Sequence, residues 1–115
     1  MPNYWATSLL MVIAACGTVF DRGVTLHLEN GDSVSLDSVV VFTSGHQYFL
    51  GSLAPGERRS IVVRATGESR FEIEHGRGQR KRINLGGYFE SGYRGSYFAR
   101  VRRDSVLAIA DSTRI

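Results

Sequence analysis

Apolar and polar positions alternate with a period close to two along most of the chain after Gly23. The segment Val24–Leu28 is apolar at every second position, and Arg70–Glu74 places Phe71 and Ile73 between charged residues. Because side chains of a β-strand point alternately to its two faces, each segment predicts a strand with one buried face. No eleven-residue window in this region has the spacing of an amphipathic helix. The pattern therefore predicts an all-β domain.

Turn signals separate about eight such segments at intervals of 8–12 residues. They include Asn30-Gly31 and Ala54–Glu57, in which Pro and Gly take the two central positions of a type II turn. Short, regularly spaced strands over roughly 95 residues predict an immunoglobulin-like antiparallel β-sandwich of about seven to eight strands. Within the second strand, Val39–Phe42 is expected to be buried on both faces. The expected strands are 24–28, 34–43, 47–50, 60–65, 70–74, 81–85, 97–102 and 106–109, with a break at 86–87.

The first third of this domain resembles bacterial immunoglobulin-like modules of the cell-adhesion-related type. The resemblance rests on the Asn30-Gly31 turn, the Val39–Val41 run and the link LGSLAPGE at residues 50–57, and it covers residues 24–63. It implies a spacer or adhesion unit and carries over no catalytic residue.

The N-terminal stretch has a different character, reading MPNYWATSLLMVIAAC over residues 1–16. Its uninterrupted apolar run, Leu9–Ala15, is far shorter than the ~20 residues that span a bilayer as a helix. The run matches the apolar core of a secretory signal, which small residues follow at the cleavage site. We therefore interpret residues 1–15 as a signal peptide rather than a membrane span.

The only cysteine of the chain stands where such a signal would be cut. Ile13-Ala14-Ala15-Cys16 resembles the lipobox of bacterial lipoprotein precursors, in which the cysteine receives diacylglycerol, the signal is cleaved before it, and the new amino group is acylated. The resemblance implies that Cys16 is lipidated and that residues 16–22 tether a sandwich formed by residues 23–115. It also implies outer-membrane localisation, because Gly17 is not the aspartate that retains family members in the inner membrane.

One feature departs from the pattern of lipoprotein precursors. Met1–Ser8 contains no Lys or Arg, whereas lipoprotein signals usually begin with basic residues. In the alternative interpretation, residues 4–20 form a buried first strand or short helix and Cys16 is an ordinary core residue. A single cysteine excludes an intramolecular disulfide in either case.

Charge is distributed unevenly along the chain, whose formal net charge is +3. Residues 17–74 carry −3 and residues 75–115 carry +6, an asymmetry that could steer anions to one end of the molecule. It falls short of the dense basic surface of a nucleic-acid binder. The candidate binding residues are Arg77, Arg80, Lys81 and Arg82 in a glycine-flanked loop, which Arg100 and Arg102 extend by strand alternation. Their ligand would be an anionic glycan, a lipid phosphate or an envelope protein; alternatively, they form a solvated hairpin whose charges prevent aggregation.

Other candidate chemistry is sparse. The aromatic and glycine-rich run at residues 86–98 predicts core packing or a tyrosine corner, with stacking on sugar rings as the alternative. His27, His46 and His75 lack the spacing of a metal site, although His75 stands beside Glu72 and Glu74. No nucleophile or phosphate-loop motif is present. We therefore expect neither catalytic residues nor a metal or cofactor.

Together these patterns predict a non-catalytic bacterial envelope lipoprotein, anchored to the outer membrane on its periplasmic or surface face. Two alternatives stay open. One is a soluble β-sandwich that binds an anionic ligand through loop 77–82. The other is an accessory subunit of a surface assembly, which would expose a strand edge to its partner.

Overall fold

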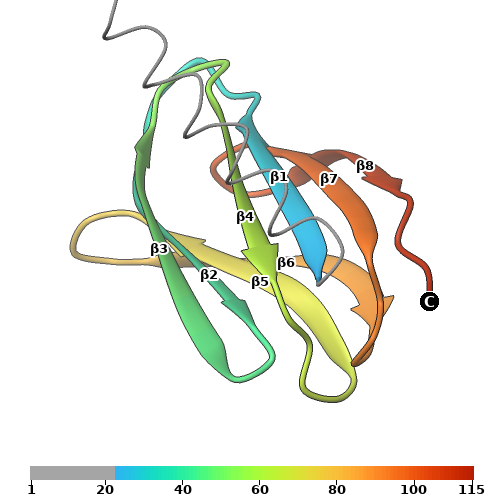
Figure 1. Cartoon of the computed structure of the whole chain (residues 1–115). Coiled ribbons are helices and arrows are strands. Elements are labelled where there is room, and N and C mark those ends of the chain that lie inside the picture. The colour runs from blue at the N-terminus through green and yellow to red at the C-terminus, as the bar shows by residue number, and fades with distance from the viewer. Residues whose placement is uncertain (1–22) are drawn as a thin grey trace, which may run out of the picture.

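The computed structural model describes residues 23–115, all of whose regular elements are strands (Figure 1). Within this range no helix is long and apolar enough to cross a membrane. The predicted signal and Cys16 lie outside the described residues. The strands are β1 (Val24–Asn30), β2 (Leu36–Thr43), β3 (His46–Leu53), β4 (Arg58–Val63), β5 (Ser69–His75), β6 (Lys81–Phe89), β7 (Gly95–Val101) and β8 (Val106–Asp111).

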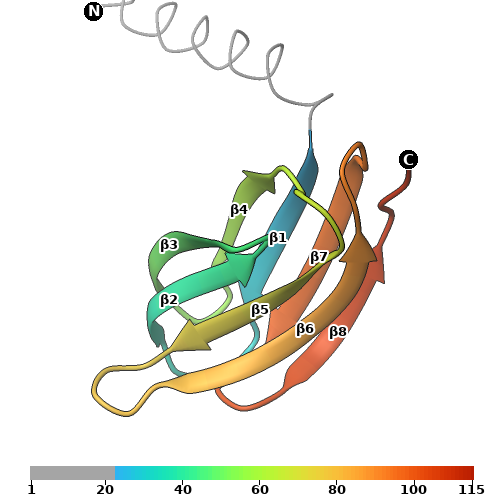
Figure 2. The same cartoon turned by 90° about the horizontal axis from the view of Figure 1, so that it is seen from below.

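The strands form two four-stranded sheets that pack face to face (Figures 1 and 2). The first sheet has the order β4-β1-β7-β8 and the second the order β3-β2-β5-β6. The predicted β-sandwich is thus confirmed. Neighbouring strands are antiparallel with one exception, since β1 runs parallel to β7.

The inward residues of both sheets make one apolar core. On β1 the alternation is complete, and Val24, Leu26 and Leu28 are all buried. On β5 the fully buried Phe71 stacks against Phe89 of β6, with 4.9 Å between the ring centroids. Burial of each such side chain stabilises the fold by about 1.5–3 kcal/mol relative to an exposed position. The apolar residues that recur at every second position in the sequence are therefore the residues that form this core.

The apolar run in β2 is buried on both faces at its first three positions, as predicted. Val39 and Val41 are fully buried, and Val40 is only 7% exposed. The ladder with β3 is irregular on both sides of Val39, so the strict alternation of faces is interrupted there. Phe42 is half-buried on the outer face, where the guanidinium of Arg82 lies 4.2 Å from its ring centroid.

The predicted break at residues 86–87 is wrong, because β6 continues through both glycines to Phe89. Gly86 and Gly87 have φ values of +80° and +88°, which glycine adopts without the steric cost of a side chain. A Cβ on Gly87 would lie 3.1 Å from the ring of Tyr97. The glycines thus allow a bulge that accommodates Tyr97, whose hydroxyl donates a 2.7 Å hydrogen bond to the carbonyl of Leu85.

The Asn30-Gly31 turn does not form a hairpin; it leads from one sheet to the other. Asn30 is fully buried, and its side-chain amide donates to the carbonyls of Val34 and Leu53, both at 2.9 Å. Its side-chain oxygen accepts the backbone N–H of Asp32 at 2.8 Å. One side chain therefore fixes the path from β1 to β2 and joins it to the end of β3.

The predicted type II turn at Ala54–Glu57 is present beside Asn30. The N–H of Glu57 donates to the carbonyl of Ala54 at 2.9 Å, and Gly56 has the positive φ of +79° that this turn requires. The N–H of Gly56 also donates to the carbonyl of Asn30 at 2.8 Å, and the N–H of Asn30 donates to the carbonyl of Glu57 at 2.9 Å. Both inter-sheet connections at this end of the sandwich thus converge on Asn30.

Replacement of this side chain tests its role. We expect Asn30→Ala to lower the free energy of unfolding by about 2–4 kcal/mol, because it leaves buried donors and acceptors without partners. Asn30→Asp keeps the acceptor but loses both donated bonds, so it should also destabilise. Urea denaturation followed by far-UV circular dichroism measures both, with the exposed Gln47→Ala as control. A change below about 0.5 kcal/mol for Asn30→Ala, the range of ordinary surface substitutions, would contradict this role.

Candidate functional site

The predicted basic loop forms the β5–β6 hairpin, where most of its cations are in ion pairs. Arg77 lies 3.8 Å from Asp37, and Arg80 lies 3.1 Å from Glu74. Arg82 lies 3.6 Å from both Glu72 and Glu74. Exposed ion pairs of this kind contribute little to stability, but they cancel the local charge.

This pairing removes much of the charge asymmetry seen in the sequence. Five basic residues from the second half of the chain pair with acids from the first half, because the strands that carry them are neighbours in the sandwich. The five are Arg77, Arg80, Arg82, Arg100 and Arg103, and their partners are Asp37, Glu74, Glu72, Glu29 and Asp32. The expected separation of charge is therefore largely absent from the folded molecule.

Arg100 and Arg102 do not extend the loop in the way that strand alternation predicted. Arg100 lies on the outer face of the other sheet, 3.1 Å from Glu29 of β1. Strand β7 ends at Val101, and Arg102 belongs to the following turn, where its N–H donates to the carbonyl of Ser105 at 2.8 Å. Of the six candidate cations, Lys81 and Arg102 form no ion pair within residues 23–115.

A polar cleft of about 400 Å³ lies between the β5–β6 loop and the β7–β8 loop. Two cations, Lys81 and Arg103, line it together with two acids, Asp37 and Asp104. The buried ring of His75 closes its floor, with Nε2 2.6 Å from the carbonyl oxygen of Arg103. The remaining lining residues are Ser35, Gly76 and Gln79. Mixed charge and many hydrogen-bonding groups suit a polar partner, whereas few apolar surfaces are offered.

Asp32 holds the β7–β8 loop in place at this cleft. Its carboxylate accepts the backbone N–H of Arg103 at 3.0 Å and that of Ser33 at 2.7 Å, and the Arg103 guanidinium lies at 3.4 Å. The hydrogen bond from the Arg103 N–H is the main reason that the pKa of Asp32 is lowered, and it outweighs the opposing effect of burial. A carboxylate that stays charged in the fold thus fixes one wall of the cleft.

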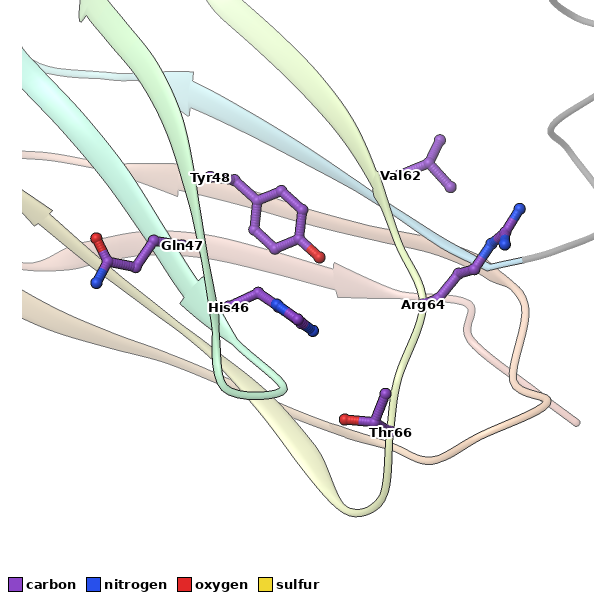
Figure 3. A pocket seen from close by; sticks show the side chains of 6 residues that line it. All are labelled: His46, Gln47, Tyr48, Val62, Arg64 and Thr66. Carbon is purple, nitrogen blue, oxygen red and sulfur yellow. The ribbon is translucent and has the colours of Figure 1, made fainter.

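A second cavity, of about 480 Å³, opens between the edge strands β3 and β4 (Figure 3). The ring of Tyr48 packs against the core and meets His46 edge-on, with 6.4 Å between ring centroids. Sequence reasoning missed this groove, because β3 and β4 belong to different sheets. The residues that line it are His46, Gln47, Tyr48, Val62, Arg64 and Thr66.

The outer face of the first sheet carries an aromatic and cationic cluster that the sequence did not indicate. The guanidinium carbons of Arg58 and Arg100 lie 4.9 Å and 5.9 Å from the ring centroid of Phe98. Both arginines pair with Glu29, at 3.2 Å and 3.1 Å. Partial burial, reinforced by Arg58, lowers the pKa of nearby His27. Within the described chain, both arginines thus find their partners inside the cluster. We therefore assign the cluster a role in the stability of the fold rather than in binding.

The aromatic and glycine-rich run divides between core and surface. Phe89 and Tyr97 pack in the core, as predicted. The Tyr97 hydroxyl bonds twelve residues upstream, across the sandwich, rather than within the few residues of a tyrosine corner. Tyr88 is 50% exposed, and its hydrogen bond to Glu90 raises its pKa to about 12.

The histidines do not assemble a metal site in the described part of the chain. His75 points into the sandwich, whereas Glu72 and Glu74 lie on the opposite face of β5. No group of three or more His, Cys, Asp or Glu side chains among residues 23–115 is arranged to hold a metal ion.

Comparisons with known proteins bear on the fold alone. No protein-family model and no curated protein matches the chain. A similar solved structure is the NMR structure of a protein from Eubacterium rectale, with a TM-score of 0.58 and 12% sequence identity. The alignment covers 78% of this chain and 91% of that one. The likeness agrees with the β-sandwich architecture described above.

The role of Asp32 at the cleft can be tested through pH. We expect Asp32→Asn to destabilise the protein at pH 7, because an amide cannot replace both accepting oxygens. Because folding lowers the pKa of Asp32, its charged carboxylate stabilises the fold at pH values above the ordinary aspartate pKa of about 3.9. This stabilisation is lost as the pH falls through the lowered pKa of the folded state.

The difference between wild type and variant in urea midpoint should therefore be largest at neutral pH and shrink below about pH 4. Asp37→Asn, which removes an exposed carboxylate from the same cleft, is the matched control and should have little effect. An equal loss of stability at pH 7 and at pH 2 for Asp32→Asn would contradict the assignment.

Proposed function

We propose that this protein is a bacterial envelope lipoprotein whose β-sandwich binds a partner without catalysing a reaction, anchored to the outer membrane through Cys16. The observation that carries the proposal is the place of Cys16 directly after an apolar run and shortly before the first strand, which begins at Val24.

The arrangement of the strands supports this division of the chain. The eight described strands lie within residues 24–111, and the described core draws its side chains from the same range. Cleavage before Cys16 would therefore leave every described strand in place.

The two ends of the sandwich would then have different surroundings. Gly23 lies where β1 begins, at one end of the sandwich (Figure 2). The cleft lies at the other end, where Asp32, two residues after β1 ends, holds the Arg103 that lines it. Seven residues of strand span about 23 Å, which is more than the Debye length of about 8 Å at physiological salt. The cleft would thus lie beyond the distance over which charges near Gly23 act.

A second candidate function is that of an accessory subunit in a surface assembly. It is favoured by β8, an edge strand on which Leu107 and Ile109 are 45% and 43% exposed. An edge of this kind can accept an added strand from a partner. This second function is compatible with the lipid anchor, because it specifies what the protein binds and not how it is attached to the membrane.

The anchor is tested by the intact mass of the protein purified from membranes of a Gram-negative host. We expect loss of residues 1–15 and a mass increase from acyl chains on Cys16. The Cys16→Ser variant should carry no lipid and should leave the membrane fraction. An unmodified wild-type chain that begins at Met1 in the cytosol would refute the proposal and favour a soluble anion-binding protein.

A further inference from the structure

Three arginines share the last row of the β4-β1-β7-β8 sheet, where the described chain begins. The registers of β1 with β4 and β7, continued by one residue beyond Val24, place Gly23 between Arg64 and Arg94. Arg94 is in turn bridged to Arg114 by two backbone hydrogen bonds of 2.8 Å. The row therefore runs Arg64, Gly23, Arg94, Arg114, and we call its three arginines the Arg row.

The side chains of the Arg row lie on one face and are exposed. Val63 is fully buried, so the adjacent Arg64 points to the outer face. The side chain of Tyr93 packs against the core, so the adjacent Arg94 points to the outer face as well. Arg114 lies directly opposite Arg94. In Figure 3, Arg64 points away from the rings on β3. Like charges in directly opposite positions destabilise a sheet, so this arrangement calls for a counter-charge.

Within residues 23–115, no carboxylate lies within 4.0 Å of an Arg-row side-chain nitrogen. Eight other arginines of residues 23–115 are in ion pairs, but none of the Arg row is. Three acids, Glu68, Glu90 and Asp111, also lie toward this end of the sandwich, but none is in an ion pair with the Arg row in the described chain. Glu90 accepts the Tyr88 hydroxyl, and Asp111 accepts the N–H and hydroxyl of Thr113. In the sequence, Asp21 and Arg22 precede Gly23 and add one charge of each sign.

We propose that the Arg row binds headgroup phosphates of the bilayer that holds the Cys16 lipid, so that the sandwich stands end-on at the membrane. This inference rests on the proposed lipid anchor. Seven residues from Cys16 to Gly23 span at most about 25 Å, which keeps this end of the sandwich within reach of the bilayer surface. Guanidinium groups bind phosphate in a bidentate manner, and anionic leaflets attract basic residues near their surface.

The single lysine of the chain makes the orientation measurable. Lys81 lies at the start of β6, at the end of the sandwich opposite Gly23. In the lipidated protein, an amine-reactive dye on Lys81, located by peptide mapping, reports energy transfer to acceptor-labelled lipids. We expect transfer to fall when vesicles of neutral phosphatidylcholine are replaced by vesicles that also contain phosphatidylglycerol. The fall should disappear at roughly 1 M salt, where the Debye length is about 3 Å.

Substitution of the Arg row should abolish this lipid-dependent difference. The test variant combines Arg64→Gln, Arg94→Gln and Arg114→Gln. The control combines Arg58→Gln, Arg77→Gln and Arg102→Gln, which removes the same charge from elsewhere. Because Arg58 belongs to the stabilising cluster around Phe98, circular dichroism first shows that the control is folded, and it should then keep the difference. If the triple variant is poorly folded by circular dichroism, Arg94→Gln alone should reduce the difference and serves in its place.

The outcomes separate the anchor from the orientation. Protein that does not float with vesicles and carries no lipid mass refutes the anchor, and the inference with it. Protein that floats, but whose energy transfer is unchanged or rises on anionic vesicles, refutes the end-on arrangement and leaves the anchor intact. Wild-type behaviour of the folded Arg-row variant also refutes it.

Discussion

The sandwich depends on one buried amide. Asn30 ends β1, and the hydrogen bonds of its side chain and backbone reach the 31–35 connection, the end of β3 and the 54–57 turn. The N–H of the next residue, Gly31, donates to the carbonyl of Val101 at the end of β7 at 2.8 Å. Two sheets held together only by apolar side-chain contacts could slide against each other, since such contacts are not directional. A buried amide permits one arrangement, because each of its donors and acceptors needs a partner.

The strands were predictable because each has one buried face, and the period of two is visible in a single sequence. The sequence could not show the features that depend on which strands are neighbours in the sheets. The parallel pairing of β1 with β7 joins residues far apart in the chain. The continuation of β6 through Gly86 and Gly87 depends on the ring of Tyr97, which arrives from the next strand. Glycines indicate an irregularity, but only the neighbouring side chain decides whether the strand ends or bulges.

The same limit applies to the candidate site. Of the four cations in the predicted basic loop, only Lys81 lines the cleft. Arg77, Arg80 and Arg82 pair with acids of β2 and β5, so their number in the sequence overstated the free charge. Arg64, Arg94 and Arg114 were overlooked because they are isolated in the sequence and become adjacent only through sheet register. A run of like charge in a sequence is therefore weaker evidence of a charged surface than a row of scattered charges brought together by strand pairing.

The central place of β1 also determines when the fold can form. Both hydrogen-bonding partners of this first strand, β4 and β7, come later in the chain, and the side chains of Glu29 and Arg100, which meet across β1 and β7, are 71 residues apart. Topologies dominated by such distant contacts fold slowly, because loop closure precedes the gain from pairing. A chain that emerges N-terminus first could pair β1 with β4, but the other edge of β1 would stay open until β7 had also emerged. The strand order itself would delay completion of this sheet until nearly the whole chain is available.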